Sequence, residues 1–317
     1  MWYYIIIRGD CVIWFVIIFL LFVITIVLSL YWAFKTAFMR SNIRLISFET
    51  GPLSKYKSFF DNGLKYIDGL TSDRIYIKSY DGLKLAGSYY KCNDSDTTIL
   101  LFHGYRSDGR FDFACVVKYY IELGLNVLVV DQRANGESEG KLITFGIKER
   151  HDVLSWIEYI NKTYSPKNIF ISGVSMGATT VMMASNLELP HNICGIIADC
   201  GFTDPPEIIK KVALQAFKIN ADPILPSLNA MCKLFGGFDL YETSTVQSLA
   251  ESDIPIFFIH GKCDGFVPYE MTETSYNAAK AEKYICLVDN ADHGISFLVD
   301  TENIQKQIST FIKSHCS

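Results

Sequence analysis

A serine in a glycine-flanked turn has the setting of a catalytic nucleophile. Ser175 stands in Gly173-Val-Ser-Met-Gly177, directly after the apolar run NIFIS and before the helix-like segment ATTVMMASN. A serine at a sharp turn from a buried strand into a helix needs glycine neighbours, because strand and helix come too close for a Cβ. The hydroxyl then lies near a helix N-terminus, where backbone N–H groups favour developing negative charge. The five residues alone are also compatible with a tight turn that has no chemistry.

A serine hydroxyl needs a base to become a good nucleophile, and one histidine is suitably placed. His293 lies in Asn-Ala-Asp-His-Gly, just after the last apolar run, where a loop is expected. From such a loop it can reach Ser175 across the carboxyl edge of a sheet; a histidine in a surface loop is the alternative. His151 and His315 are expected on helix surfaces, and His191 in a connecting loop.

Two aspartates compete for the role of orienting this histidine and stabilising its cation. Asp264 follows the apolar run that ends in His-Gly, and Asp199 ends the preceding run, in Ala-Asp-Cys-Gly. We favour Asp264 and keep Asp199 as its rival. Asp292, next to the histidine, is expected to be a solvated loop charge.

The oxyanion that forms during acyl transfer needs two N–H donors. The first is expected to be the backbone N–H of Met176, the residue after the nucleophile. The second is expected from the loop after the first parallel strand, LFHGY, where Tyr105 is the candidate. In the same loop we expect His103 and Gly104 to support the turn, with His103 hydrogen-bonding it in place; a catalytic role for His103 is the alternative.

Alternating strand-like and helix-like segments predict the sheet that would bring these residues together. Short apolar runs typical of parallel strands buried on both faces occur at 97–102, 126–130, 168–171, 193–198, 254–260 and 284–288. Helical periods lie among them, for example around 153–160 and 304–312. Alternation on either side of Asp81-Gly82, within 74–90, predicts an antiparallel hairpin in front of the sheet. The pattern predicts an α/β fold, a mostly parallel sheet flanked by helices.

The stretch from about 202 to 252 interrupts this alternation. It is punctuated by prolines, is rich in Leu, Phe and Met, and contains no clear strand. An insertion of this length is expected to be a helical lid or an extra subdomain. Its apolar side chains would suit an acyl chain; the alternative is that they only pack the insertion onto the domain.

The N-terminal part of the chain contains an apolar segment long enough to cross a membrane. No charged residue occurs at 11–34, and a helix of that length spans about 36 Å. Aromatic residues at 2–4 and 31–32 suit the two interfaces. A cleaved signal peptide is the alternative, although the run is longer than usual and no small-x-small site follows it.

Flanking charges predict the side of the membrane on which the rest of the chain lies. Arg8 is offset by Asp10, whereas Lys35, Arg40 and Arg44 follow the apolar segment without a nearby acid. The positive-inside rule therefore places the C-terminal side in the cytoplasm. Nine scattered cysteines fit reduced thiols and show no zinc-site spacing. A net charge of −5 gives no basic footprint for nucleic acid.

Together these residues resemble the α/β-hydrolase superfamily. The resemblance covers about 74–317 and rests on His-Gly at 103–104, Asp-Gln-Arg-Ala-Asn-Gly-Glu-Ser at 131–138, the serine turn, His-Gly-x-x-Asp-x-x-Val-Pro at 260–268, and the late histidine. The chain order Ser175, Asp264, His293 is that of the superfamily. Within it, the sequence is similar to single-pass, N-terminally anchored serine hydrolases grouped with prolyl-oligopeptidase-like enzymes. Ala134 stands where the family usually has the first glycine of D-x-R-G-x-G-x-S.

The resemblance implies hydrolysis of an ester, thioester or amide through an acyl-enzyme, without a cofactor or a metal. We divide the chain into an anchor with its flank at 1–36, a membrane-proximal lead-in at 37–70, and a catalytic domain at 71–317 that includes the insertion. The apolar insertion and the anchor favour an ester or thioester with a lipid-like acyl group.

A serine peptidase or amidase is the second hypothesis for the activity. It predicts a charged anchor for a peptide terminus, for which the insertion offers only the well separated Glu207 and Glu242. A catalytically silent binding scaffold is the third hypothesis, and the complete set of candidate residues disfavours it.

Overall fold

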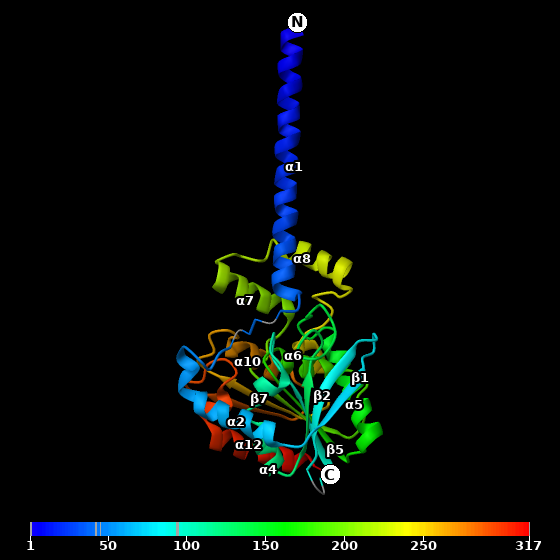
Figure 1. Cartoon of the computed structure of the whole chain (residues 1–317), viewed down its shortest axis with the longest axis vertical. Coiled ribbons are helices and arrows are strands. Elements are labelled where there is room, and N and C mark those ends of the chain that lie inside the picture. Colours follow the sequence, from blue (N-terminus) through cyan, green and yellow to red (C-terminus); the bar gives the residue numbers. More distant parts are fainter. Residues whose placement is uncertain (1, 42, 45, 93–94, 317) are drawn as a thin grey trace.

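The computed structural model describes residues 2–41, 43–44, 46–92 and 95–316; at 2–12 only the helical backbone is described. Expectations for the side chains of the N-terminal flank, at 2–4, Arg8 and Asp10, therefore lie outside the described residues. Below its N-terminal helix, α1, the chain folds into an α/β domain (Figure 1).

Within the described residues, one eight-stranded sheet is ordered β1-β2-β4-β3-β5-β6-β7-β8. Its strands are β1 Asp73–Lys78, β2 Lys84–Tyr90, β3 Thr97–Phe102, β4 Asn126–Asp131, β5 Asn168–Val174, β6 Ile193–Asp199, β7 Ile256–Gly261 and β8 Lys283–Val288. β2 is antiparallel to its neighbours β1 and β4, and the strands from β4 across to β8 pair in parallel. The predicted mostly parallel sheet with a hairpin in front is confirmed.

Burial along the strands explains why their sequence patterns differ. β3 and β4 are buried at every residue, so both faces of each strand are apolar. The outer strands β1 and β8 include exposed positions, because one side of each faces solvent. Continuous apolar runs such as 97–102 and 126–130 are therefore the sequence signal of these central strands.

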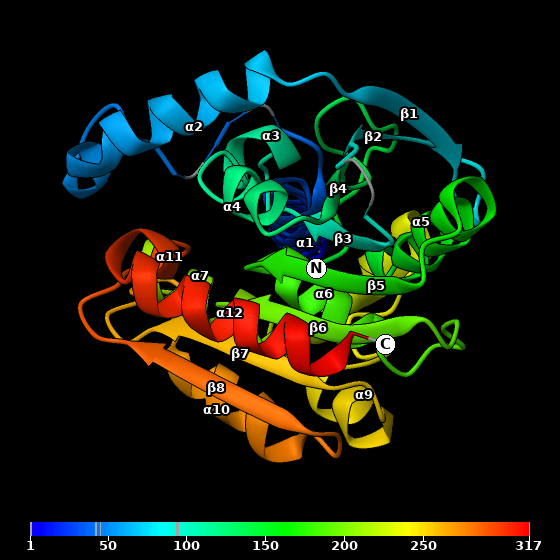
Figure 2. The ribbon, with the colours of Figure 1, turned by 90° about the horizontal axis from the view of Figure 1, so that it is seen from below.

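Helices cover both faces of the sheet (Figure 2). α4 (Val117–Glu122), α11 (Ser296–Val299) and α12 (Thr301–His315) pack on one face. α5 (Glu149–Tyr164), α6 (Met176–Ala184), α9 (Thr245–Glu251) and α10 (Tyr269–Ala278) pack on the other. Each face carries its own apolar core, so the sheet forms the middle of three layers.

The strand order reverses direction at β3. β4 follows β3 in the chain and pairs on one side of it, whereas β5 pairs on the other side. Connections that leave in opposite directions open a crevice beyond the carboxyl ends of these strands. Ser175 follows β5, and the loop at 103–105 follows β3, so the topology places both at this crevice.

The lead-in segment is folded onto the domain. It contains a 3₁₀ turn (Pro52–Tyr56) and α2 (Lys57–Gly69), for which the sequence analysis gave no helix. α2 packs so closely that a Cβ at Gly63 would lie 2.2 Å from the carbonyl oxygen of Ala114. The rings of Phe48 and Phe60 stack with centroids 4.4 Å apart. The segment after the anchor therefore contributes to the core.

α1 (Trp2–Phe38) projects from the domain and contains an apolar stretch, Ile13–Phe38, long enough to cross a membrane (Figure 1). Its last turns are part of the domain, because Phe34 and Phe38 are buried in a cluster that includes Leu225 and Leu228. An N-terminal helix of this length and composition could anchor the chain to a membrane.

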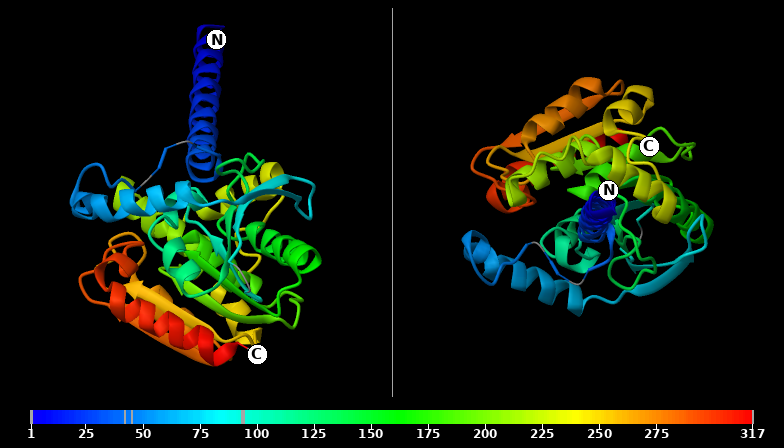
Figure 3. Two further views of the ribbon diagram at one scale, coloured as in Figure 1. Left: turned by 60° about the horizontal axis from the view of Figure 1, so that its bottom comes forward. Right: turned by 90° about the horizontal axis from the view of Figure 1, so that it is seen from above.

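The insertion surrounds the lower end of α1. It consists of α7 (Pro205–Phe217), α8 (Leu225–Met231), a π-helical turn (Cys232–Gly236) and α9, and no strand is present among its residues, all of which the structure describes. α7 and α8 flank the base of α1 (Figures 1 and 3). The ring of Phe217 lies 5.6 Å from that of Trp32. Some of the apolar side chains of this stretch therefore contact α1.

Candidate active site

Ser175 occupies a strained turn between β5 and α6. Its backbone has φ 55° and ψ −118°, a conformation that L-residues rarely adopt. A Cβ at Gly173 would lie 2.2 Å from the carbonyl carbon of Gly177, and one at Gly177 would lie 1.8 Å from the carbonyl oxygen of Phe102. Both flanking residues must therefore be glycine for α6 to pack against β3 and β5.

The structure brings together the three side chains that the sequence analysis singled out. His293, in the loop after β8, places Nε2 2.9 Å from Oγ of Ser175. Its Nδ1 lies 2.7 Å from Oδ2 of Asp264, in the loop after β7. The result is one hydrogen-bonded chain from hydroxyl to imidazole to carboxyl, the arrangement that activates a serine.

Asp264 is held as a carboxylate. Burial alone would raise its pKa, but hydrogen bonds from His260 and His293 outweigh burial and hold the pKa of Asp264 well below its usual range. The backbone N–H groups of Phe266 and Val267 also donate to Oδ1, both at 2.8 Å. An ionised partner is what the imidazolium needs when His293 takes a proton.

The rival acid, Asp199, has a different environment. Its Oδ1 accepts a hydrogen bond from Oγ of Ser296 at 3.3 Å, and burial raises the pKa of Asp199 to about 6. Its backbone carbonyl accepts the N–H of Ser175 at 2.8 Å. Asp199 therefore supports the serine turn through its backbone, and the geometry favours Asp264 as the partner of His293.

His260 is a site residue that sequence reasoning treated only as part of a motif. It is fully buried at the end of β7, with Nε2 3.1 Å from Oδ2 of Asp264 and 3.0 Å from the carbonyl oxygen of Val267. Since Nε2 faces two acceptors, it carries the proton, and the hydroxyl of Thr272 donates to Nδ1 over 2.7 Å. The spacing of His260 and Asp264, four residues apart after a strand, was the available signal.

Asp292 joins two loops of the site. It is exposed, as expected for a loop charge, but its Oδ1 accepts the backbone N–H of Gly265 at 3.0 Å and that of His293 at 2.7 Å. The loops that carry the acid and the base are therefore linked by this side chain.

The loop after β3 lies against the nucleophile. A Cβ at Gly104 would come within 3.4 Å of the Cβ of Ser175. The N–H of Gly104 already donates to Oδ2 of Asp112 over 2.7 Å, so the next N–H along, that of Tyr105, is the candidate oxyanion donor. The hydroxyl of Tyr105 donates to the carbonyl of Ala37 at 2.7 Å, which links this loop to the end of α1. Met176 opens α6 directly after the serine, as expected for the first donor.

Asp112 and His103 hold this loop in shape. Asp112, which sequence reasoning missed, also accepts the hydroxyl of Ser107 at 2.5 Å, and burial raises its pKa. His103 accepts the N–H of Gln132 at Nε2 over 2.9 Å, and its Nδ1 lies 2.7 Å from the carbonyl of Gly104. Because both ring nitrogens of His103 are engaged, the arrangement fits the expected supporting role.

One group of side chains in the site has metal-ligand chemistry. Cys200, Asp264 and His293 offer ligand atoms within 4.8 Å of one another. However, Asp264 and His293 are already bonded to each other, and burial raises the pKa of the Cys200 thiol well above its usual range. A thiol that stays protonated is a poor ligand. Asp264 and His293 therefore fit a proton relay better than a metal site.

A cavity of about 530 Å³ has Ser175 and His293 in its wall. All of its described lining residues lie outside the insertion. The sequence had instead suggested that the insertion would bind an acyl chain. The buried apolar residues of 202–252, among them Leu225 and Leu228, pack against α1 and the domain instead, as in the alternative that was kept open.

Comparison with known proteins agrees with the fold. A family model described as serine aminopeptidase, S33, matches residues 93–234. The uncharacterized protein YqkD of Bacillus subtilis (strain 168) is 27% identical over 80% of this chain and 84% of its own length. The uncharacterized membrane protein YNL320W of Saccharomyces cerevisiae is 21% identical over 67% of this chain and 72% of its own.

Solved structures give the same result. The esterase Pf2001 of Pyrococcus furiosus is 25% identical, with a TM-score of 0.63 over 80% of this chain and 93% of its own. Est1E of Butyrivibrio proteoclasticus, solved with ferulic acid, is 18% identical, with a TM-score of 0.60 over 76% of this chain and 98% of its own. The chain therefore has the α/β-hydrolase fold.

Proposed function

We propose that the protein is a membrane-anchored serine hydrolase that cleaves an ester or thioester through an acyl-enzyme. The observation that carries this proposal is the chain of hydrogen bonds of 2.9 and 2.7 Å from Ser175 through His293 to Asp264. The pKa of Asp264 is held well below its usual range, so the carboxylate is ready to stabilise an imidazolium.

In the first half of the reaction, Oγ of Ser175 attacks the acyl carbonyl carbon while its proton passes to Nε2 of His293. The carbonyl oxygen becomes an oxyanion bound by the N–H groups of Met176 and Tyr105. When this intermediate collapses, His293 returns the proton to the departing alcohol or thiol, and the acyl group stays on Ser175.

In the second half, His293 takes a proton from water as that water attacks the acyl-enzyme carbon. The second oxyanion occupies the same N–H pair, and its collapse releases the carboxylic acid. The proton on His293 goes back to Oγ of Ser175, which restores the starting state. No cofactor enters this sequence.

We further propose that α1 is retained as the anchor and that the division at 1–36, 37–70 and 71–317 describes the working parts of the chain. Removing α1 as a signal peptide would strip Phe34 and Phe38 from the cluster beneath the insertion. The charges at Lys35, Arg40 and Arg44 favour a cytoplasmic domain. Protease added to intact cells should leave the domain whole, and cleavage from outside would contradict this sidedness.

A peptidase is the second candidate, and the description of the matching family model favours it. The two glutamates considered as anchors for a peptide terminus already have partners. Glu207 pairs with Lys210 at 2.8 Å, and Glu242 pairs with Arg150 at 2.8 Å. Because both carboxylates are neutralised, neither supports capture of a peptide amine.

Substrate panels would separate the candidates. The full-length protein in detergent would be assayed with p-nitrophenyl butyrate, a butyryl thioester and alanine p-nitroanilide, with Ser175→Ala as the blank. We expect kcat/KM for the ester and the thioester to exceed that for the anilide at least about 100-fold. Faster turnover of the anilide would favour the peptidase. A folded protein inert toward all three substrates would favour the silent scaffold.

A further inference from the structure

We propose that the cavity behind Ser175 is an acyl-chain site that takes one long saturated chain along the face of the sheet. This inference rests on the proposed function and names its substrate class, a monoacyl ester or thioester. It departs from the expectation that the insertion would hold the chain.

The cavity runs from the nucleophile back along the strands. Its floor includes Ser172 on β5 and Ile197 on β6, which pair with each other in the sheet. Ser172 precedes Ser175 by three residues, so this level lies about 10 Å from the nucleophile. The path leads away from the carboxyl edge, where the leaving group would remain.

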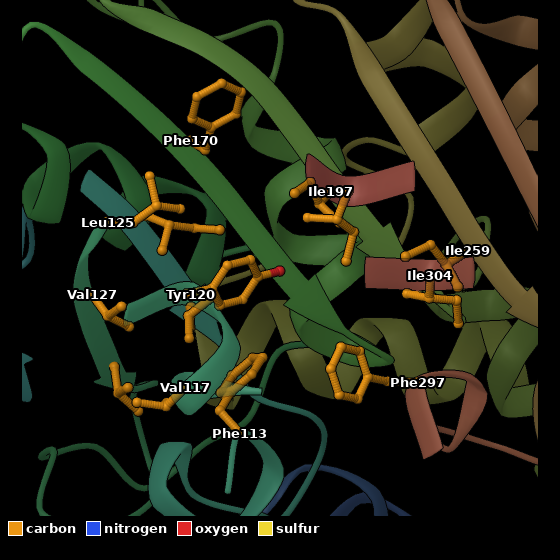
Figure 4. Packing of buried hydrophobic residues seen from close by; sticks show 14 of the residues in the cluster. Phe113, Val117, Tyr120, Leu125, Val127, Phe170, Ile197, Ile259, Phe297 and Ile304 are labelled. Atoms are coloured by element: carbon orange, nitrogen blue, oxygen red, sulfur yellow. The ribbon is translucent and has the colours of Figure 1, made fainter. Parts of the chain in front are cut away.

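Helices on the same face form the side walls. α4 contributes Tyr120, α11 contributes Phe297, and α12 contributes Ile304 and Ile308. Figure 4 shows Tyr120 on one side of this space and Phe297 and Ile304 on the other. All four side chains are more than nine-tenths buried, so a chain lying between them would be removed from water.

Behind the far end, next to the lining residue Ile308, lies an aromatic ring. Phe311, one turn beyond Ile308 on α12, packs so tightly on β6 that a Cβ at Gly195 would lie 2.8 Å from its ring. Because Gly195 precedes Ile197 by two residues, this contact blocks the path toward the amino ends of the strands. The site therefore has a definite depth, which predicts a limit on chain length.

The segment that follows the anchor forms the remaining wall. Ile46, Phe48, Leu53 and Phe60 line the cavity. Ile46 reaches the catalytic loop, since a Cβ at Gly294 would lie 3.9 Å from its Cδ1. These four side chains therefore make their part of the wall apolar.

The distribution of charge along the wall fits this occupant. Its charged residues belong to the lead-in segment, to the last position of β6, or to segments that follow the carboxyl ends of strands: Arg44, Asp199, Arg106, Asp112 and Asp292. The wall formed by the sheet and the helices is otherwise aliphatic or aromatic apart from the hydroxyls of Ser172 and Tyr120 and the thiol of Cys115, and Ser47 and Thr50 add hydroxyls from the lead-in segment. An uncharged chain matches the deep part, whereas a peptide with charged side chains would lose hydration there without ionic partners.

A chain-length series with one wall residue enlarged tests the proposal. In the full-length protein, Ile308→Phe would be assayed against p-nitrophenyl esters from acetyl to palmitoyl. We expect kcat/KM for the palmitoyl ester to fall at least about tenfold, with the acetyl ester unchanged within about twofold. Ile308→Ala should shift the preferred length upward.

Ile312→Phe is the matched control, because Ile312 is equally buried one turn along α12 but does not line the cavity. The readout is the ratio of kcat/KM for the palmitoyl ester to that for the acetyl ester within each variant. A smaller amount of folded protein lowers both values equally and leaves this ratio unchanged. An unchanged chain-length profile in both Ile308 variants would overturn the acyl site while leaving the hydrolase intact. Absence of any ester hydrolysis by the wild type would instead refute the proposed function.

Exposed apolar side chains around the base of α1 independently carry a second inference. We infer that the insertion sits in the interface of the bilayer that α1 enters, an inference that depends on α1 being the anchor. Leu214 and Phe217 end α7, Ile219 follows it, and Leu234 and Phe235 lie in the π-helical turn. Each of the five is between 44% and 76% exposed.

These residues lie near the depth at which α1 leaves the domain. Phe217 contacts Trp32, and the exposed Tyr31 and Trp32 are the aromatic residues expected at that interface. α7 and α8 lie on either side of the helix (Figures 1 and 3), so a bilayer around α1 meets both. Lys218 and Lys233 accompany the apolar residues, a mixture typical of interfacial helices.

Depth-dependent quenching tests this placement. In a background with Cys11, Cys263 and Cys316 changed to serine, an environment-sensitive dye would be attached to Phe235→Cys in nanodiscs containing nitroxide-labelled lipid. We expect blue-shifted, quenched emission, as for Ile24→Cys within α1, whereas Tyr284→Cys on the distant β8 should not respond. Quenching at 24 without quenching at 235 would overturn the inference. No quenching at either position would instead refute the anchor.

Discussion

His260 hydrogen-bonds to the same carboxylate oxygen of Asp264 that receives His293, at 3.1 Å against 2.7 Å. Since His260 is also bonded to Thr272 and to the carbonyl of Val267, its ring position is determined by the fold rather than by substrate. We interpret His260 as a positioning residue that holds Asp264 ionised and aimed at His293.

Replacing His260 should slow catalysis without weakening substrate binding. In His260→Phe the carboxylate loses a hydrogen bond, and bonds to charged groups contribute about 1.5–3 kcal/mol. We therefore expect kcat for p-nitrophenyl butyrate to fall roughly 10–100-fold with KM unchanged. Thr272→Val, which removes the bond to Nδ1 of His260 but leaves the bond from His260 to Asp264, should have a smaller effect. A rise in KM with constant kcat would show that His260 shapes the pocket instead.

Asp199→Asn should stabilise the protein at neutral pH. Burial raises the pKa of Asp199 from 3.8 to about 6, so the folded state binds a proton more tightly than the unfolded chain does. The stability that protonated Asp199 contributes to the folded state is fully present below pH 3.8 and is lost as pH rises through about 6. Above that pH the ionised group costs on the order of 2–3 kcal/mol.

Chemical denaturation between pH 4 and pH 8 would measure this effect. The free energy of unfolding of Asp199→Asn should exceed that of the wild type at pH 7.5, and the two should converge toward pH 4. The substitution should also leave hydrolysis of a short ester near the wild-type rate. A large loss of activity would restore Asp199 as the catalytic acid.

The two glycines beside the nucleophile should not tolerate even alanine. In Gly177→Ala the new methyl would lie 1.8 Å from the carbonyl oxygen of Phe102, so α6 must move away from β3. We expect the free energy of unfolding to fall by more than about 3 kcal/mol, or the variant not to fold at all. Gly69→Ala is the control, because nothing lies within 4 Å of a Cβ there. Equal melting temperatures for the two variants would contradict the tight elbow.

The buried ion pairs of Arg133 should contribute more to the stability of the folded protein than exposed ion pairs do. Its guanidinium bonds to Asp152 at 2.6 Å and to Asp81 at 2.9 Å, and its side chain is 2% exposed. Arg133→Met would leave Asp152 buried without a partner, at a cost of about 3–5 kcal/mol. Lys167→Met, which breaks an exposed pair with Asp96, should leave the unfolding midpoint unchanged. Similar midpoints for both variants would contradict this account.

The sequence predicted the sheet and the candidate triad because both leave local signals. Strands buried on both faces, such as β3 and β4, are continuous apolar runs. The loops that follow parallel strands converge at one edge, so Ser175, Asp264 and His293 could be placed together without knowledge of side-chain packing. The conformation of the serine turn followed from its glycines.

Other features depend on packing between distant segments. α2 has ordinary composition, and its place is set by the approach of Gly63 to Ala114. Asp112 becomes part of the site only through its bond to Gly104. The insertion is apolar whether it covers a substrate or holds a helix, and only the structure shows its contact with α1. The cavity is formed by residues from Arg44 to Ile308, and no local pattern encodes it.

The most direct test of an activated serine is covalent labelling of the full-length protein by a fluorophosphonate probe. We predict that the wild type is labelled, that Ser175→Ala is not, that His293→Ala and Asp264→Asn react at least about 100-fold more slowly, and that Asp199→Asn reacts normally. A folded wild-type protein that resists the probe, or labelling that persists in Ser175→Ala, would contradict the account.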